Sequence, residues 1–459
     1  MHSASSNSRS SANRATARKQ SEVKMVHTPA NNTLPISGRD HRLDLFRGIA
    51  NWAIFLDHIP NNVVAWITIR NYGFSDAAEL FIFMSGYMTS LVCTNIMRRR
   101  GFVAGMSWLM KRVWQLYVAH IFLFVLYAAM IGHIAQSYDN PTLINEFNIA
   151  GLVSNPFDVL TQGLLLRFKP LNMDVLPLYI VLLAGILPIL WLMLRLPDAT
   201  MLGSLYLYLA ARHFGWNLSA YPEGAWYFNP FTWQLLFVLG AWFAVGGAKR
   251  SRRLIRSRSL LYVGVVYLLF SFAMTMAGHI PNLANEFPKW LFDAFNPNDK
   301  TDLAPYRVIH FAFIALLATR LLPVNWSGLQ CSILQPLIKC GEQSLHVFCS
   351  GIILSFLAHF VLESGSQTVL AQILVSVAGL SIMTAIAYFA SWSKTFDKPR
   401  SLAFLGHSGS DVIETADSDD AEVRSKTVLA WSDPTFLTKG KNGGYVGIGS
   451  RKNVHLKCQ

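Results

Sequence analysis

Long runs of apolar residues, unbroken by charge, constrain this chain more than any other feature of its sequence. A run of about 18 such residues can cross a bilayer hydrocarbon core of about 30 Å as a helix. We therefore predict an all-α, polytopic helical membrane protein with about ten transmembrane helices. The candidate spans are residues 43–60, 76–96, 113–132, 175–194, 200–214, 231–247, 259–278, 305–322, 344–361 and 368–392.

The composition agrees with this class and argues against a soluble nucleic-acid-binding protein. Only 14% of the residues are charged, whereas soluble domains carry about 25%. The net charge of +13 comes largely from short basic segments between the apolar runs, such as 98–100 and 249–258. Such segments orient a membrane protein and contact anionic lipid. The expected partner of these residues is the lipid bilayer, and we predict no nucleic-acid partner.

Basic residues are divided unevenly between the two sets of connections, and cytoplasmic loops are the ones enriched in Lys and Arg. If the N-terminus lies inside, the outer connections, chiefly 61–75, 133–174, 214–230 and 280–304, carry Arg70, Arg167, Lys169, Lys289 and Lys300. The inner connections carry Arg98, Arg99, Arg100, Lys111, Arg112, Arg195, Lys249, Arg250, Arg252, Arg253, Arg256, Arg258, Arg320 and Lys339. We therefore predict that both termini are cytoplasmic.

The polar ends of the chain are predicted to lie outside one transmembrane domain of residues 39–392. Residues 1–38 are rich in Ser, Asn and Arg, with Glu22 as their one acid, and no apolar segment of signal-peptide type follows them. We expect a disordered cytoplasmic arm, although the composition also overlaps with organellar transit peptides. Residues 393–459 are expected to form a disordered cytoplasmic tail. The five cysteines show no Cys-x-x-Cys spacing, so we expect reduced thiols and no metal site.

The first span carries a stripe of polar side chains. At 100° per residue, Asp44, Arg47, Asn51 and His58 share an arc of about 60°, and Asp57 falls outside it. A charged group at the centre of a membrane helix costs about 3 kcal/mol and usually faces a bundle interior or a wet cavity. The alternative is a structural Asp44–Arg47 pair near the inner interface, with His58 at the outer one.

Further polar candidates lie elsewhere in the chain. On the second span Asp76, Glu79 and Tyr87 fall on one side together with Gly86, which would allow close approach of a neighbouring helix. Helix packing and the helix dipole also explain that pattern. Lys111, Arg112 and Gln115 share a face at the inner start of the third span, where they could meet an anionic cofactor or simply follow the positive-inside rule. In the outer loop 214–230, Trp226 and its aromatic neighbours could stack on sugar rings or lie in an interfacial aromatic belt.

Two of these segments resemble the opening of the acyltransferase-3 superfamily of membrane O-acyltransferases. They are Asp44, Arg47, Gly48 and His58, followed by Glu79-Leu-Phe-Ile-Phe-Met-Ser-Gly-Tyr87. Six further stretches, in order along the chain, are similar to the OpgC family in particular. They are residues 39–44, 57–61, 70–76, 113–120, 174–179 and 228–234.

The resemblance implies a bacterial inner-membrane enzyme that modifies osmoregulated periplasmic glucans, typically with succinyl groups. The essential histidine of the superfamily corresponds to His58, and its neighbouring acid and arginine correspond to Asp44 and Arg47. The superfamily often has a second arginine where this chain has Gln115. The expected co-substrate is an acyl-CoA such as succinyl-CoA, with no permanently bound cofactor.

These observations lead to a predicted site and to two rival functions. We expect His58, Asp44 and Glu79 to be catalytic, with His58 as general base and Glu79 or another span orienting it. Arg47, Lys111 and Arg112 are expected to bind the acyl-CoA phosphates, and Asn51, Asp76, Tyr87 and Trp226 to bind the glucan. The alternatives are a transporter or exporter of a glycan or small anion, and a non-catalytic membrane scaffold.

Overall fold

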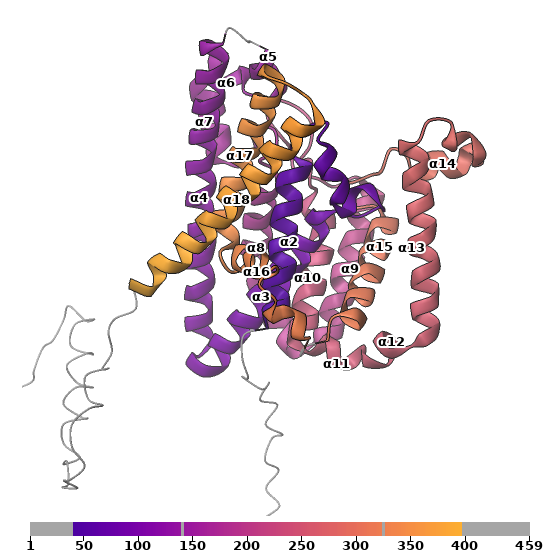
Figure 1. Ribbon diagram of the computed structural model, residues 1–459. Helices are drawn as coiled ribbons and strands as arrows, with labels where there is room; N and C mark the ends of the chain where they lie inside the picture. Colours follow the sequence, from indigo (N-terminus) through magenta and orange to yellow (C-terminus); the bar gives the residue numbers. More distant parts are fainter. Residues whose placement is uncertain (1–39, 139–141, 324–325, 397–459) are drawn as a thin grey trace, which may run out of the picture. The chain divides into compact units, whose positions relative to one another are not determined.

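A computed structural model describes residues 40–138, 142–323 and 326–396. Within these ranges the chain is a bundle of helices without a strand; its one β-bridge joins Ser219 and Ala225 (Figure 1). The arm predicted over 1–38 and nearly all of the tail predicted from 393 lie outside the described residues. The last helix ends at Phe396.

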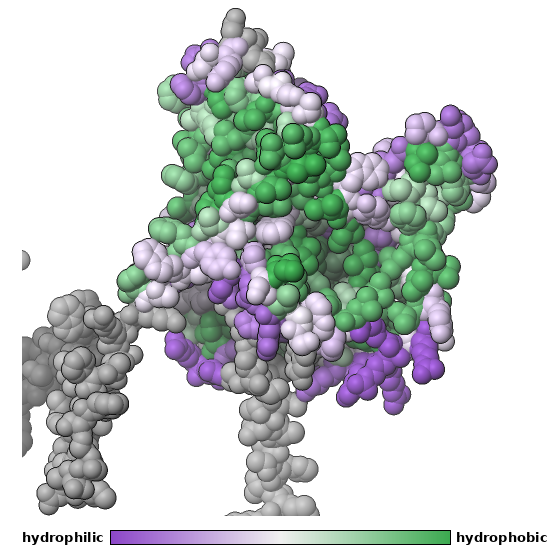
Figure 2. Space-filling view, viewed as in Figure 1, coloured by the Kyte–Doolittle hydropathy of each residue, from purple (hydrophilic) through white to green (hydrophobic). Residues whose placement is uncertain are grey.

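All ten predicted spans are helical. Among the described residues, seven helices are long and apolar enough to cross a membrane, one of them running from Pro230 to Arg250, and α2, α9 and α15 fall outside that set. Their exposed sides form an apolar belt with polar residues beyond it (Figure 2). The protein is therefore an all-α polytopic membrane protein. The ten helices are α2 (His41–Asp57), α3 (Ala77–Arg100), α4 (Phe102–Ser137), α8 (Val175–Arg195), α9 (Pro197–Phe214), α10 (Pro230–Trp242), α13 (Arg258–His279), α15 (Pro305–Leu321), α17 (Ser344–Ser364) and α18 (Val369–Phe396).

Short helices occupy the connections that the sequence predicts only as loops. The α-helical ones are α5 (Thr142–Glu146), α6 (Ala150–Ser154), α7 (Pro156–Leu164), α11 (Ala248–Arg250), α12 (Arg252–Arg256), α14 (Lys289–Phe295) and α16 (Gln335–Glu342). The others are the 3₁₀ turns η1 (Val63–Ile67), η2 (Ile69–Asn71), η4 (Leu283–Glu286) and η5 (Ser327–Gln330), and a π turn, η3 (Phe243–Gly247), that continues α10.

Glycine allows two pairs of helices to touch backbone to backbone. A side chain at Gly86 of α3 would collide with the carbonyl of Phe237 in α10, which confirms the close approach expected at this glycine. A side chain at Gly341 of α16 would collide with the carbonyl of Asp44 in α2. The helix that carries the polar stripe is thereby held tightly against α16.

The two ends of the bundle differ in chemistry. At one end, called here the basic end, α2 begins and α3 finishes with Arg98, Arg99 and Arg100. At the other, called the cavity end, α2 finishes and α3 begins. The 36 residues of α4 span about 54 Å, well beyond a hydrocarbon core of about 30 Å. This helix starts at Phe102, 11 residues before the predicted span, so Lys111 and Arg112 lie within it rather than at its start.

Candidate functional site

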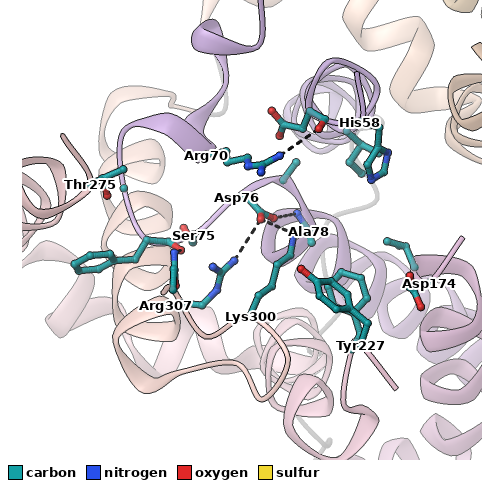
Figure 3. A pocket seen from close by; sticks show the side chains of 18 of the residues that line it. His58, Arg70, Ser75, Asp76, Ala78, Asp174, Tyr227, Thr275, Lys300 and Arg307 are labelled. Carbon is teal, nitrogen blue, oxygen red and sulfur yellow. Dashed lines mark hydrogen bonds and ion pairs between the residues drawn. The ribbon is translucent and has the colours of Figure 1, made fainter. Parts of the chain in front are cut away.

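A cavity of about 580 Å³ opens at the cavity end of the bundle. Its walls come from the ends of α2 and α13, the starts of α3, α8 and α15, and the loops around Tyr227 and Lys300. The close-up in Figure 3 shows His58 on one wall and Asp76 between Lys300 and Arg307 on another, with Asp174 and Tyr227 nearby. The chain therefore gathers ionisable groups from distant segments around one chamber.

His58 is the first residue after α2. Its backbone N–H still donates to the Ile54 carbonyl (3.2 Å), and the chain then turns into the loop before α3. The ring is half-buried, and its Nδ1 is enclosed without a hydrogen bond among the described residues. Neutral imidazole carries one donor and one acceptor nitrogen. Among the described residues, no protein group forms a hydrogen bond with Nδ1, so none determines which ring nitrogen carries the proton.

Asp57 precedes His58 and also lines the cavity. Its carboxylate accepts a hydrogen bond from the Thr68 hydroxyl (2.7 Å), and its backbone carbonyl accepts one from Arg70 (3.2 Å). The loop after α2 is therefore tied back to the end of the helix. This arrangement places Arg70 at the mouth of the cavity.

The start of α3 carries a network of two acids and two bases. Asp76 caps the helix by accepting from the Ala78 N–H (2.8 Å), and Glu79 accepts from the Asp76 N–H (2.9 Å). Arg307 donates to Glu79 (2.7 Å) and lies 3.4 Å from Asp76, while Lys300 lies 2.6 Å from Asp76. Glu79 and Arg307 are almost fully buried. The two acids and two bases neutralise each other, which offsets the cost of burying four ionisable groups together.

Burial alone would lower the pKa of Lys300, but the charges of Asp76 and Glu79 outweigh it and raise that pKa above its usual value. Lys300 therefore remains a cation on the cavity wall.

A second ion pair reaches the cavity through Asp174. The Lys169 ammonium is 3.9 Å from Asp174 and 3.7 Å from the centre of the Trp226 ring. Burial lowers the pKa of Lys169 to about 8 although Asp174 opposes the shift, and burial raises the pKa of Asp174 to about 6 although Lys169 opposes it. Both groups are therefore charged at neutral pH but close to titration.

The comparison with family models gives one result. Residues 39–395 match the family model described as OpgC protein. The chain belongs to the OpgC family. This membership supports a glucan-modifying function of the OpgC type. No curated protein and no solved structure matches the chain.

The residues that the sequence assigns to the OpgC-type site do not all reach the cavity. His58 and Asp76 line it. Glu79 does not line it and contacts the cavity residue Arg307, not His58. Asp44 and Asn51 are buried lower on α2; Asn51 donates to the Ser344 hydroxyl (3.2 Å). The 14 residues from Asp44 to His58 correspond to about 21 Å of helix. The polar stripe therefore faces protein and leads from the basic end toward the cavity.

Five other predicted residues lie outside the cavity walls, and one of them is Arg47 on α2. Tyr87 is 11 residues along α3 from Asp76, which is about 16 Å. Lys111 and Arg112 are on the part of α4 nearer the basic end. Trp226 is only 3% exposed and is covered by Lys169, so the aromatic residues of this loop that line the cavity are Tyr227 and Phe228 instead.

Lys300, Arg307 and Asp174 are cavity residues that the sequence analysis does not assign to the site. Arg307 could have been found from the sequence, because a charged residue inside a predicted span, here three residues before His310, needs a partner. Lys300 and Asp174 lie in loops, where a charged residue is ordinary. The helical wheel places Asp57 outside the arc that holds His58; both line the cavity because the regular helix ends between them.

Proposed function

We propose that this OpgC-family protein transfers an acyl group from a cytoplasmic acyl-CoA to a hydroxyl of a periplasmic glucan. Succinyl-CoA is the donor to test first. In this proposal the protein lies in a bacterial inner membrane with both termini in the cytoplasm. The observation that carries the proposal is His58, a half-buried imidazole with an unbonded Nδ1 on the wall of a polar cavity.

The chemistry required of the site is modest. A glucan hydroxyl oxygen attacks the thioester carbonyl carbon while His58 takes the hydroxyl proton. The C–O ester bond forms, the C–S bond breaks, and the proton passes to the departing CoA sulfur. A neutral imidazole has one nitrogen with a free lone pair, which can accept that proton and later return it.

The charged groups of the cavity supply a means of stabilising the tetrahedral intermediate. Lys300 and Arg70 both line the chamber, and a fixed positive charge near a developing oxyanion lowers the barrier of acyl transfer. Lys300 is already anchored by Asp76 (2.6 Å). It would therefore need little reorganisation during the reaction.

The distribution of basic residues supports the direction of transfer. The basic end carries the arginines that close α3 and those of α11 and α12, as expected for a cytoplasmic face. A donor would approach there, with Arg47, Lys111 and Arg112 as candidate phosphate ligands. The acyl group would follow the stripe of Asp44 and Asn51 toward His58, while the glucan reaches the cavity from the periplasm.

A His58→Ala variant tests the proposal in membrane vesicles supplied with succinyl-CoA and purified periplasmic glucan. Loss of a general base typically slows a reaction by about 100-fold or more. We expect a loss of at least that size in the initial rate of ester formation, with the variant still inserted in the membrane. His133→Ala is the matched control, because His133 is exposed on α4 and absent from the cavity walls.

Mass spectrometry of periplasmic glucans gives an independent test. Cells that contain the protein should carry succinylated glucan, and cells that lack it should not. Identical acyl content in the two samples would refute the proposed function.

A further inference from the structure

Two more cavities adjoin the one that holds His58. One, of about 680 Å³, shares Asp57, His58 and Arg70 with it. The other, of about 320 Å³, shares Asp174 and Tyr227 with it. We call them the α2 arm and the α8 arm. Leu171 lines all three cavities, and His58 lines both the central cavity and the α2 arm, so a chain that occupied both arms would pass His58.

The wall of the α2 arm includes several amide side chains and an exposed aromatic ring. Asn61, Asn71 and Asn172 contribute side chains to its wall, and Glu146 lies at its edge, 3.2 Å from His359. Trp66 is 42% exposed and lines the same cavity. A tryptophan at a membrane surface needs no ligand, but this one borders a polar hollow.

The α8 arm repeats this combination with different residues. Tyr221 and Tyr227 line it together with Arg167, Glu223 and Asn148. Tyr227 is 49% exposed, and it also borders the central cavity. Each arm therefore has at least one aromatic ring in its wall.

The chemistry of both arms fits a neutral sugar chain. A sugar ring offers hydroxyls that both donate and accept hydrogen bonds, and apolar C–H faces that pack on aromatic rings. Amides and paired charges match the hydroxyls. The charges of the α8 arm are balanced, with Arg167 and Lys169 against Asp174 and Glu223, so an anionic polymer gains no net attraction there.

The volumes point to more than one sugar residue. A cavity of about 300–1,000 Å³ is enough to hold one small ligand, and here three cavities in that range adjoin one another. A single terminal sugar with its incoming acyl group would leave both arms unused.

We propose that the protein binds its glucan along the interior of the chain, with sugar residues in both arms while His58 faces a residue between them. This inference rests on the proposed function and adds an acceptor preference to it. It follows that the enzyme acylates internal residues of a glucan and favours long acceptors over short ones.

The test uses the full-length protein in lipid vesicles, succinyl-CoA, and linear glucose oligomers of two and of eight residues as acceptors. Fragment mass spectrometry locates the ester on the eight-residue product. We expect esters on internal residues and a higher kcat/KM for the longer acceptor. Esters confined to the terminal residues, or equal kcat/KM for both lengths, would overturn the inference.

Variants in the two arms sharpen the test. Trp66→Ala and Tyr221→Ala each remove a ring that lines one arm but not the central cavity. Loss of one stacked ring corresponds to about a threefold to tenfold change in binding. We expect each to lower the ratio of long-acceptor to short-acceptor kcat/KM by that factor, mainly through KM. Trp290→Ala is the control, because Trp290 is 72% exposed on α14 and lines none of the three cavities.

The outcomes separate this inference from the proposed function. No ester on any acceptor, with protein that is correctly inserted, would refute acyl transfer itself. Ester formation with an unchanged length ratio in both arm variants would leave acyl transfer standing and refute the role of the arms.

Discussion

At the residue scale, the network at the start of α3 shows how a charged site is tolerated beside a membrane core. Glu79 is fully buried, and Arg307, which neutralises it, is 2% exposed. Removing one member of a buried pair leaves an uncompensated charge, whereas removing both leaves none. The stability of this end of α3 therefore depends on the pair being complete.

Arg307→Met should destabilise the protein by about 3–5 kcal/mol, because Glu79 then loses its partner in a buried place. The double variant Glu79→Leu with Arg307→Met should recover much of that loss. Denaturant unfolding in detergent micelles measures both, and Arg252→Met on exposed α12 is the control. A double variant no more stable than Arg307→Met would contradict this account.

The Lys169–Asp174 pair predicts a pH dependence. Burial raises the pKa of Asp174 from 3.8 to about 6, so the folded protein binds this proton more tightly than the unfolded chain does. Its contribution to stability is therefore fully present below pH 3.8 and is lost as the pH rises through about 6. Relative to Asp174→Asn, the wild type should lose up to about 3 kcal/mol between those values.

Melting temperatures of wild type and Asp174→Asn between pH 4 and 7 test this expectation. Asp158→Asn is the control, because Asp158 is exposed at the start of α7. A wild type that gains stability relative to Asp174→Asn as the pH rises would show that the sign is wrong.

How far single residues could be predicted depends on where they lie. His58 and Asp76 lie in or beside apolar runs, where a polar group is unusual and therefore informative. Lys300 and Asp174 lie in outer loops, and their sequence positions give no sign of what they face. Trp226 was predicted to stack on a sugar ring, but the Lys169 ammonium lies over its ring instead.

At the element scale, length and apolarity decide whether a helix can cross a membrane, and among the described residues they account for seven of the ten predicted spans; α2, α9 and α15 are helical but fall short of that criterion. The helix α16 and its contact with α2 were not predicted, because they depend on how the helices pack. Helix α16 has only eight residues and includes Lys339 and Glu342, so it resembles a loop. Its contact with α2 through Gly341 becomes visible only in the folded bundle.

Gly86→Ala tests the close contact between α3 and α10. The added methyl would meet the backbone carbonyl of Phe237, which can move only with its helix. Overpacking of this kind typically costs about 1–3 kcal/mol, so the melting temperature should fall. Gly203→Ala on α9 is the matched control, because a side chain there meets nothing within 4 Å. It should be neutral or slightly stabilising, and equal effects of the two changes would argue against the close contact.

At the scale of the whole molecule, the sequence and the structure divide the bundle into the same two ends, one basic and one not. The sequence puts most basic residues on one set of connections, and the structure brings the end of α3, α11 and α12 to the basic end (Figures 1 and 2). The cavity with His58 opens at the other end. The sequence could predict this division by charge alone, but not that the opposite end is hollow, because its lining comes from segments as distant as His58 and Arg307.

The orientation of the protein is testable with a membrane-impermeant thiol reagent on intact cells. Lys289→Cys places an exposed thiol on α14, and Arg256→Cys places one on α12 at the basic end. The native thiols Cys331, which is exposed, and Cys458, which lies outside the described residues, are first changed to serine. Because the positive-inside rule assigns the basic end to the cytoplasm, the reagent should label Lys289→Cys in intact cells. It should label Arg256→Cys only after the membrane is opened. The reverse pattern would place the His58 cavity on the cytoplasmic side, where a periplasmic glucan could not reach it, and the direction of acyl transfer proposed here would then be wrong.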